Sequence, residues 1–305
     1  MSKGCSCKGS EVEEFDAKRA FENLAWKNEQ LATLVAQYMS QAGMDRTTRS
    51  ANATNFAEEV FARIVGGQPV VVGGFPDCCL IGRKFPNGTE RWFCTGVLVN
   101  KRVILTAAHC HYPVDGSAQY VVALNTNGFN SNDFEKAEII SVRSVTIHPE
   151  YRTKMGHDIA VLVLQDDAKT PPVTIATTKE INESVRTRIV GFGNADIAST
   201  FGFGTKREVE IPVTYLRRKA GENFNQPESQ LGFESDFEFV AGGNGKDSCN
   251  GDSGGPAYIN VGGTNKLLGL TSRAFRNAVN PCGGGGIYVR VDKNMKFVNG
   301  IINSL

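Results

Sequence analysis

From Ile64 to the C-terminus, short apolar runs with a two-residue period alternate with turn signals. Side chains that recur at every second position share one face of a β-strand, whereas a helix needs a period near 3.6 residues. Dipeptides such as Asn87-Gly88 and Asn127-Gly128 separate the runs, and glycine is abundant, at 33 of 305 residues. The pattern predicts an all-β sandwich or barrel. Five of the predicted strands are Val70–Val72, Thr95–Val99, Tyr120–Leu124, Ile159–Leu164 and Lys266–Thr271.

The first 63 residues follow a different pattern. Apolar residues recur at helical spacing over 11–39, a polar linker covers 44–55, and a second short amphipathic segment covers 56–62. We therefore predict an N-terminal helical extension, residues 1–63, followed by a β domain, residues 64–305. The extension either packs on the domain as a cap or forms a prosegment that binds a regulatory partner or keeps the domain inactive.

Composition argues against several classes of function. The formal net charge of +1 at pH 7 favours neither nucleic acid nor an acidic membrane surface as a partner. No run approaches the roughly 20 apolar residues of a membrane span, and the first residues lack the apolar core of a secretory signal. The chain also has eight cysteines, and disulfides between cysteines would favour an oxidising compartment. On balance we expect the cytoplasm by a small margin, with a secreted or periplasmic location second.

Ser253 stands in the run Asn250-Gly251-Asp252-Ser253-Gly254-Gly255-Pro256. Flanking glycines allow the backbone to present the hydroxyl and to aim N–H groups at the same point, as a nucleophile beside an oxyanion site requires. Two other segments supply the groups that such a serine needs. His109 follows an apolar run, and Asp158 begins another, where burial is expected. An imidazole takes the proton of the serine hydroxyl, and a carboxylate holds the imidazole in the required tautomer.

Together these three segments resemble the trypsin–chymotrypsin family of serine proteases. Four further runs fit that family: Ile64-Val65-Gly66-Gly67, Gly191-Phe192-Gly193, Lys246-Asp247-Ser248-Cys249 and Gly286-Ile287-Tyr288-Val289. The resemblance extends from about Ile64 to the C-terminus. It implies two packed six-stranded Greek-key β-barrels with the catalytic groups at their junction, closed by a C-terminal helix over Asp292–Ile302.

The resemblance also implies roles for single residues. Ser253 is the expected nucleophile, His109 the general base and then acid, and Asp158 the orienting carboxylate. The backbone N–H groups of Gly251 and Ser253 form the expected oxyanion hole. His111 and His157 are expected to be bystanders, because neither occupies the family's histidine position. No cofactor and no metal ion is expected, and the polar segment 125–135 is predicted to be a plain surface loop in preference to a calcium site.

Two disulfides follow from the resemblance, Cys94–Cys110 beside the histidine and Cys249–Cys282 beside the serine. The other four cysteines have no counterpart in the family: Cys5, Cys7, Cys78 and Cys79.

The same resemblance predicts a precursor. In the family, cleavage just before Ile-Val-Gly-Gly frees an α-amino group that pairs with the acid preceding the nucleophile. Here the junction is Arg63-Ile64, and the acid is Asp252. Since a buried charge needs a partner, we expect the Ile64 ammonium to pair with Asp252 and to order the oxyanion loop.

Primary specificity is predicted from Asp247, which corresponds to the acid at the bottom of the trypsin pocket and favours arginine or lysine. Gly286 corresponds to a pocket-wall glycine, and Ser272 keeps the family's serine on the strand that binds the substrate backbone. Arg273 and Ala274 depart from the family's Trp-Gly at the next two positions. Ala274 adds a methyl group to the pocket rim, and Arg273 is expected to favour acidic residues at the second and third subsites.

The leading hypothesis is therefore a serine endopeptidase that cleaves protein or peptide substrates after arginine or lysine, made as a zymogen with cleavage at Arg63-Ile64. The same enzyme is a plausible activator, since Arg63 fits its own specificity. Two alternatives stay open: a protease fold used as a binding module, and a protease controlled by a partner of residues 1–63 instead of by cleavage.

Overall fold

The computed structural model describes residues 67–111, 118–154, 156–195, 202–216, 230–243, 245–276 and 282–305. The chain divides into two units, Met1–Val60 and Phe61–Leu305, and all of the described residues belong to the second unit. The predicted N-terminal helices, the linker and the junction Arg63-Ile64 lie outside the described residues.

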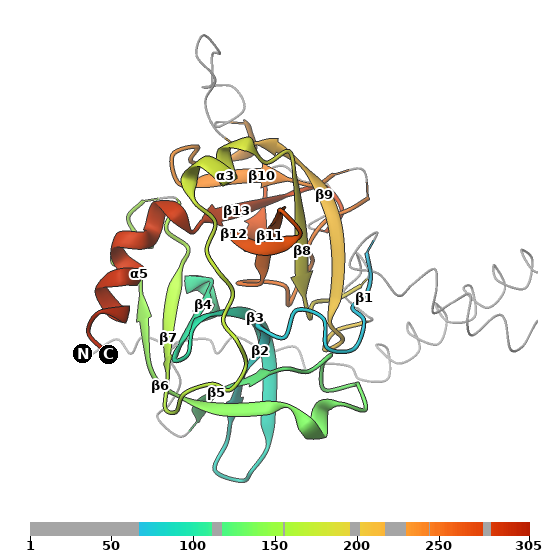
Figure 1. Ribbon diagram of the computed structural model, residues 1–305, viewed down its shortest axis with the longest axis vertical. Helices are drawn as coiled ribbons and strands as arrows, with labels where there is room; N and C mark the ends of the chain where they lie inside the picture. Colours follow the sequence, from blue (N-terminus) through green and yellow to red (C-terminus); the bar gives the residue numbers. More distant parts are fainter. Residues whose placement is uncertain are drawn as a thin grey trace, which may run out of the picture. The chain divides into compact units, whose positions relative to one another are not determined.

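The first barrel, drawn in cyan to green in Figure 1, is a closed antiparallel sheet with the strand order β2-β3-β4-β7-β6-β5. Because β4 pairs with β7 and not with the next strand along the chain, the connection is of the Greek-key type. Its core includes the fully buried Ile81, Leu98, Ile104 and Val122. The strands are β2 (Cys78–Lys84), β3 (Glu90–Asn100), β4 (Val103–Thr106), β5 (Gln119–Leu124), β6 (Glu138–Ile147) and β7 (Ala160–Leu164).

The second barrel, in yellow to red, has the order β9-β10-β13-β12-β11-β8 and is closed by pairing of β8 with β9. A two-residue strand, β1 (Gln68–Pro69), adds to β9. The chain therefore forms the two six-stranded antiparallel barrels that the family resemblance implied. The strands of this second barrel are β8 (Arg186–Gly191), β9 (Arg207–Tyr215), β10 (Glu238–Ala241), β11 (Pro256–Val261), β12 (Thr264–Ala274) and β13 (Gly286–Arg290).

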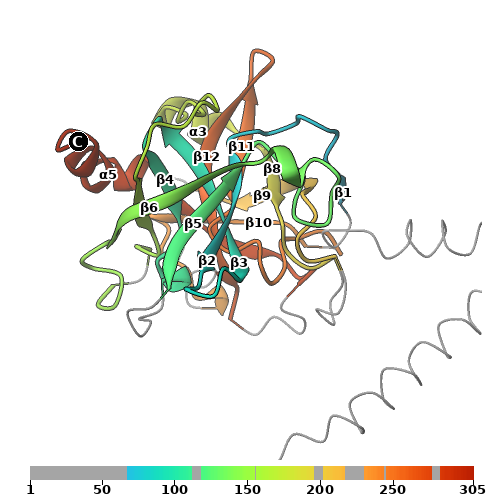
Figure 2. The same cartoon turned by 90° about the horizontal axis from the view of Figure 1, so that it is seen from below.

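Short helices complete the fold (Figure 2). The C-terminal α5 (Met295–Ile302) follows a 3-10 turn, Asp292–Asn294, so the predicted closing helix is confirmed. Its Val298 is fully buried in a cluster with residues of both barrels, including Val97 and Leu270. The other elements are α3 (Thr178–Glu183), which begins at a Thr177–Glu180 capping box, and the 3-10 turns η1 (Ala108–Cys110) and η2 (Phe134–Lys136). None of the helices in the described ranges is long and apolar enough to cross a membrane.

One predicted strand is wrong. Val70–Val72 forms no strand: only Val70 is buried, whereas Val71 and Val72 are 75% and 83% exposed. The backbone turns here, with the Gly74 N–H donating to the Val71 carbonyl at 2.9 Å. Three consecutive valines have high β-propensity, but no strand in the described part of the chain pairs with Val71 and Val72, and tertiary context overrides propensity.

Candidate active site

His109 and Asp158 meet where the first barrel ends its strands β4 and β7. His109 lies on the 3-10 turn η1, just after β4, and Asp158 lies two residues before β7. The distance between His109 Nδ1 and Asp158 Oδ2 is 2.7 Å, and the His109 backbone N–H donates to Oδ1 at 2.9 Å. The Ser272 hydroxyl donates to Oδ2 at 2.6 Å. One carboxylate therefore receives three hydrogen bonds.

These contacts determine the charge of Asp158. Burial raises its pKa, but the hydrogen bonds from the His109 ring and from Ser272, together with the His109 charge, hold the pKa below its ordinary value. An ionised carboxylate only accepts hydrogen bonds, so His109 Nδ1 carries the hydrogen. The lone pair of a neutral imidazole is then on Nε2, directed away from Asp158.

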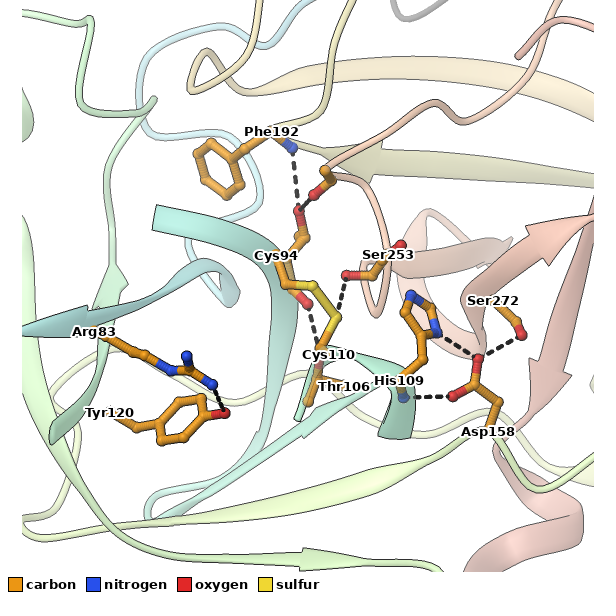
Figure 3. Close-up of a disulfide and its surroundings, with 12 residues drawn as sticks. Arg83, Cys94, Thr106, His109, Cys110, Tyr120, Asp158, Phe192, Ser253 and Ser272 are labelled. Carbon is orange, nitrogen blue, oxygen red and sulfur yellow. Dashed lines mark hydrogen bonds and ion pairs between the residues drawn. A yellow bond between two sulfur atoms is a disulfide. The ribbon is translucent and has the colours of Figure 1, made fainter. Parts of the chain in front are cut away.

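Ser253 lies on the other side of the imidazole (Figure 3). Its carbonyl accepts from the Thr95 N–H at 3.0 Å and contacts the Cys94–Cys110 disulfide at Cys110 Sγ, 3.6 Å away. Ser253 and His109 together line two cavities of about 620 Å³ each. The first cavity extends over Ser272, Arg273 and Ala274, and the second extends over Phe93 and Arg83.

The loop before Ser253 is held in a conformation that glycine permits. Gly251 has φ +98°, and a Cβ built there would lie 2.7 Å from the Phe203 ring. The Thr95 hydroxyl donates to the Gly251 carbonyl at 2.8 Å and accepts from the Phe192 N–H at 3.3 Å. Sequence reasoning missed Thr95, because its two partners lie 156 and 97 residues away along the chain.

Asp252 is completely buried beneath this loop. Its Oδ1 accepts from the Gly193 N–H and its Oδ2 from the Cys249 N–H, both at 2.8 Å. The missing side chain of Gly191 also leaves room for the Asp252 carboxylate, because a Cβ atom on Gly191 would lie 2.1 Å from Asp252 Oδ1. Burial raises the pKa of Asp252 to about 7, although the two N–H groups and the charge of the buried Arg207 act in the opposite direction.

Asp247 is also buried, with 1% of its surface exposed. Its Oδ1 accepts from the Ser248 N–H at 2.7 Å and from the Tyr288 hydroxyl at 3.2 Å, and its Oδ2 accepts from the Gly285 N–H at 2.9 Å. Burial raises the pKa of Asp247 to about 6, and these hydrogen bonds oppose the shift. Gly286 lies directly beside the Asp247 carboxylate: a Cβ atom on Gly286 would be 3.1 Å from Asp247 Oδ1. The Cys249–Cys282 disulfide joins the two segments that carry these residues.

The surroundings of Arg273 bear on its expected role at the second and third subsites. Its guanidinium makes a two-pronged pair with Glu238, at 2.5 Å from Nη1 to Oε1 and 3.0 Å from Nη2 to Oε2. It also donates to the Gly232 carbonyl at 2.9 Å and to the Ser272 hydroxyl at 3.3 Å. The fully buried Glu238 carboxylate balances the positive charge of Arg273. We therefore expect Arg273 to be a weak counter-charge for acidic substrate residues. The hydrogen bond to Ser272 instead connects it to the Asp158 group.

The two barrels, the His109–Asp158 pair and the adjacent Ser253 define the serine-protease class. Comparison with known proteins agrees: the trypsin family matches residues 64–298. Coagulation factor IX from Cavia porcellus is 33% identical over 259 residues, covering 81% of this chain and 84% of that protein. The venom serine protease Bi-VSP from Bombus ignitus is 28% identical over 251 residues, covering 77% of this chain and 67% of its own. The chain belongs to the trypsin family of serine proteases.

Proposed function

We propose that the protein is an active serine endopeptidase that cleaves after arginine or lysine. The observation that carries this proposal is the His109–Asp158 hydrogen bond of 2.7 Å, beside Ser253 in one shared cavity. The ionised Asp158 keeps the Nε2 lone pair of His109 available on the side of Ser253, which is the arrangement that activates a hydroxyl.

The catalytic sequence follows from these roles. Ser253 Oγ attacks the carbonyl carbon of the scissile bond while His109 Nε2 takes the hydroxyl proton. The N–H groups of Gly251 and Ser253 stabilise the resulting oxyanion, and each such donor is worth about 2.7–4 kcal/mol in the transition state. The imidazolium returns its proton to the leaving amine. Water then hydrolyses the acyl-enzyme by the same route, with His109 again acting as base.

Asp247 supports the preference for basic side chains. Its carboxylate is buried and held by three groups, and Gly286 beside it leaves space for a long side chain. A substrate guanidinium or ammonium offers the cation that a buried carboxylate lacks. Neutral side chains offer none, so they are rejected.

We also propose that residues 1–63 are a prosegment of the protease domain 64–305 and that cleavage after Arg63 activates the enzyme. Asp252 supports this: its carboxylate is completely buried and accepts from two backbone N–H groups, and burial raises its pKa to about 7, so a cation beside it would stabilise its ionised form. The Ile64 ammonium would supply that cation. Removing either member of such a buried pair costs about 3–5 kcal/mol.

Hydrolysis of a small arginyl amide tests the activity. We expect turnover by protein cleaved to an Ile64 terminus, loss of turnover in Ser253→Ala, and a fall in kcat on the order of 10⁴ in Asp158→Asn. Protein with a demonstrated Ile64 terminus that binds peptides but hydrolyses none would support the binding-module alternative. Arg63→Ala tests the activation step: a variant that a partner of residues 1–63 still activates fully would rule out control by cleavage.

A further inference from the structure

Three metal-ligating side chains lie together outside the groups assigned above. His148 follows β6, and Glu150 and His157 lie in the connection to β7. The rings of His148 and His157 stack with a centroid distance of 4.3 Å and an interplanar angle of 5°. One ring nitrogen of each histidine and one carboxylate oxygen of Glu150 all lie within 4.8 Å of one another.

The tautomer of His157 is determined by its neighbour Asn294. The Asn294 side-chain nitrogen donates to the Arg290 carbonyl at 2.9 Å, so its Oδ1 is the atom that lies 2.9 Å from His157 Nδ1. An amide oxygen only accepts, so Nδ1 carries the hydrogen. The lone pair of neutral His157 is then on Nε2.

This lone pair faces a second acceptor. His157 Nε2 lies 3.4 Å from Glu150 Oε2, and the His157 side chain is 5% exposed. Two acceptors do not attract each other, so the pair presents two lone pairs that a metal ion between them would satisfy.

The distances fit a metal ion. Zinc binds histidine nitrogen and carboxylate oxygen at about 2.0–2.2 Å, so two ligand atoms of a tetrahedral site are about 3.3–3.5 Å apart. His157 and Glu150 already have this separation. The third ligand atom, from His148, lies within 4.8 Å of the other two. To coordinate the same ion, the His148 ring has to rotate out of its parallel stack with His157 and move closer. This movement also gives up the 3.2 Å hydrogen bond from the Glu150 N–H to His148 Nδ1.

We propose that His148, Glu150 and His157 form a binding site for Zn²⁺ or a similar transition-metal ion, with water as the fourth ligand. Two imidazoles and one carboxylate suit zinc, whereas calcium and magnesium prefer oxygen ligands. Asn294 fixes the His157 ring from behind, as partners of metal-bound histidines usually do. The Glu150 side chain is 40% exposed, so the ion can reach the site from solvent.

The site is placed to regulate catalysis, and this consequence rests on the proposed function. His157 immediately precedes Asp158, and the Ile159 N–H donates to the His157 carbonyl at 2.8 Å. A metal ion bound to His157 therefore restrains the chain beside the carboxylate that orients His109. We expect zinc to inhibit the peptidase reversibly.

Binding is tested on the full chain carrying Cys5→Ser and Cys7→Ser, which removes the N-terminal thiols as competing ligands. We expect one Zn²⁺ per chain by calorimetry, and a Co²⁺ absorption spectrum without thiolate bands. Glu150→Gln, at a half-exposed position where folding is not at risk, should weaken Zn²⁺ binding by about tenfold or more. Lys154→Gln should strengthen it, because the Lys154 ammonium competes for the other oxygen of Glu150. Glu183→Gln, at an exposed position on α3, is the matched control and should bind as the parent does.

Equal Zn²⁺ affinity in the parent and in Glu150→Gln, or no binding at micromolar Zn²⁺, would overturn the site. Inhibition of the peptidase that persists in Glu150→Gln would place the inhibitory ion elsewhere. Binding that depends on Glu150, in protein that hydrolyses no substrate, would support the metal site while contradicting the proposed function.

Discussion

The hydroxyl of Thr95 donates a 2.8 Å hydrogen bond to the carbonyl of Gly251, which precedes the candidate nucleophile by two residues. Thr95 is fully buried on β3 of the first barrel, whereas Gly251 belongs to a loop of the second. The Thr95 backbone N–H also donates to the Ser253 carbonyl. A single residue of one barrel therefore positions the loop that would bind the oxyanion.

Replacing Thr95 with valine tests this positioning role. The change keeps the shape but leaves the Gly251 carbonyl without its donor, which costs about 1–3 kcal/mol. We expect a lower thermal midpoint and a kcat roughly tenfold lower with KM nearly unchanged, a smaller loss than the 10²–10³ for removing an oxyanion donor itself. Thr95→Ser should restore kcat. If Thr95→Val lowered stability but left kcat intact, Thr95 would have only a structural role.

Asp247 should impose a pH dependence on the binding of small cations. Its pKa of about 6 means that it is ionised above that pH and protonated below it. In a Ser253→Ala background, we expect the affinity for a benzamidine cation to be constant above about pH 6 and to fall about tenfold per pH unit below it. Calorimetry over this range checks the prediction. Asp247→Asn should bind weakly at every pH, and a parallel decline in that variant would assign the titration to another group.

Asp252 should make the uncleaved chain less stable as pH rises. Its folded pKa, about 7, lies above the ordinary 3.8, so the folded chain binds more protons than the unfolded chain between these values. Stability therefore falls from about pH 4 to pH 7, by about 4 kcal/mol at most. Urea denaturation of Arg63→Ala/Ser253→Ala at several pH values measures the slope. Asp252→Asn should reduce the slope and leave the contribution of Asp247, whose pKa is also raised, whereas Asp166→Asn, at an exposed position, should leave the slope unchanged.

Substitutions of Arg273 and Glu238 should have coupled effects on the free energy of unfolding. Arg273→Met leaves the fully buried Glu238 carboxylate without its cation, and breaking such a pair costs about 3–5 kcal/mol. Because the Arg273 side chain is 35% exposed, we expect a loss near the lower end of that range. The double variant Arg273→Met/Glu238→Gln should be less destabilised than the sum of the two singles, as measured by urea denaturation. Strictly additive effects would show that the two residues act independently.

Arg273 also bears on substrate preference. Since Glu238 already balances its charge, we expect Arg273→Met to leave the selection of acidic residues at the second and third subsites unchanged. Cleavage of a peptide library by both proteins checks this, and a loss of acidic preference in the variant would restore the original expectation.

The residues that sequence reasoning identified share a local signal. Each candidate catalytic residue is recognisable from a few neighbouring positions in the sequence. These are the glycines around Ser253, the apolar strand before His109 and the apolar strand after Asp158. Alternation of apolar and polar residues likewise predicts β-strands, because side chains on a strand follow a two-residue period wherever the strand lies. The alternation therefore predicted an all-β domain, whereas the two barrels and the closing helix were implied by the resemblance to the trypsin–chymotrypsin family.

Thr95, Glu238 and the Gly193 N–H could not be predicted in this way, and neither could the pairing of Arg273 with Glu238. Each of these groups acts through a partner from another part of the chain, as Thr95 does with Gly251, 156 residues away. Only closure of the two barrels and their packing decide which of many possible partners a buried polar group meets. A buried hydrogen-bonding group needs some partner, but its own position in the chain does not say which one.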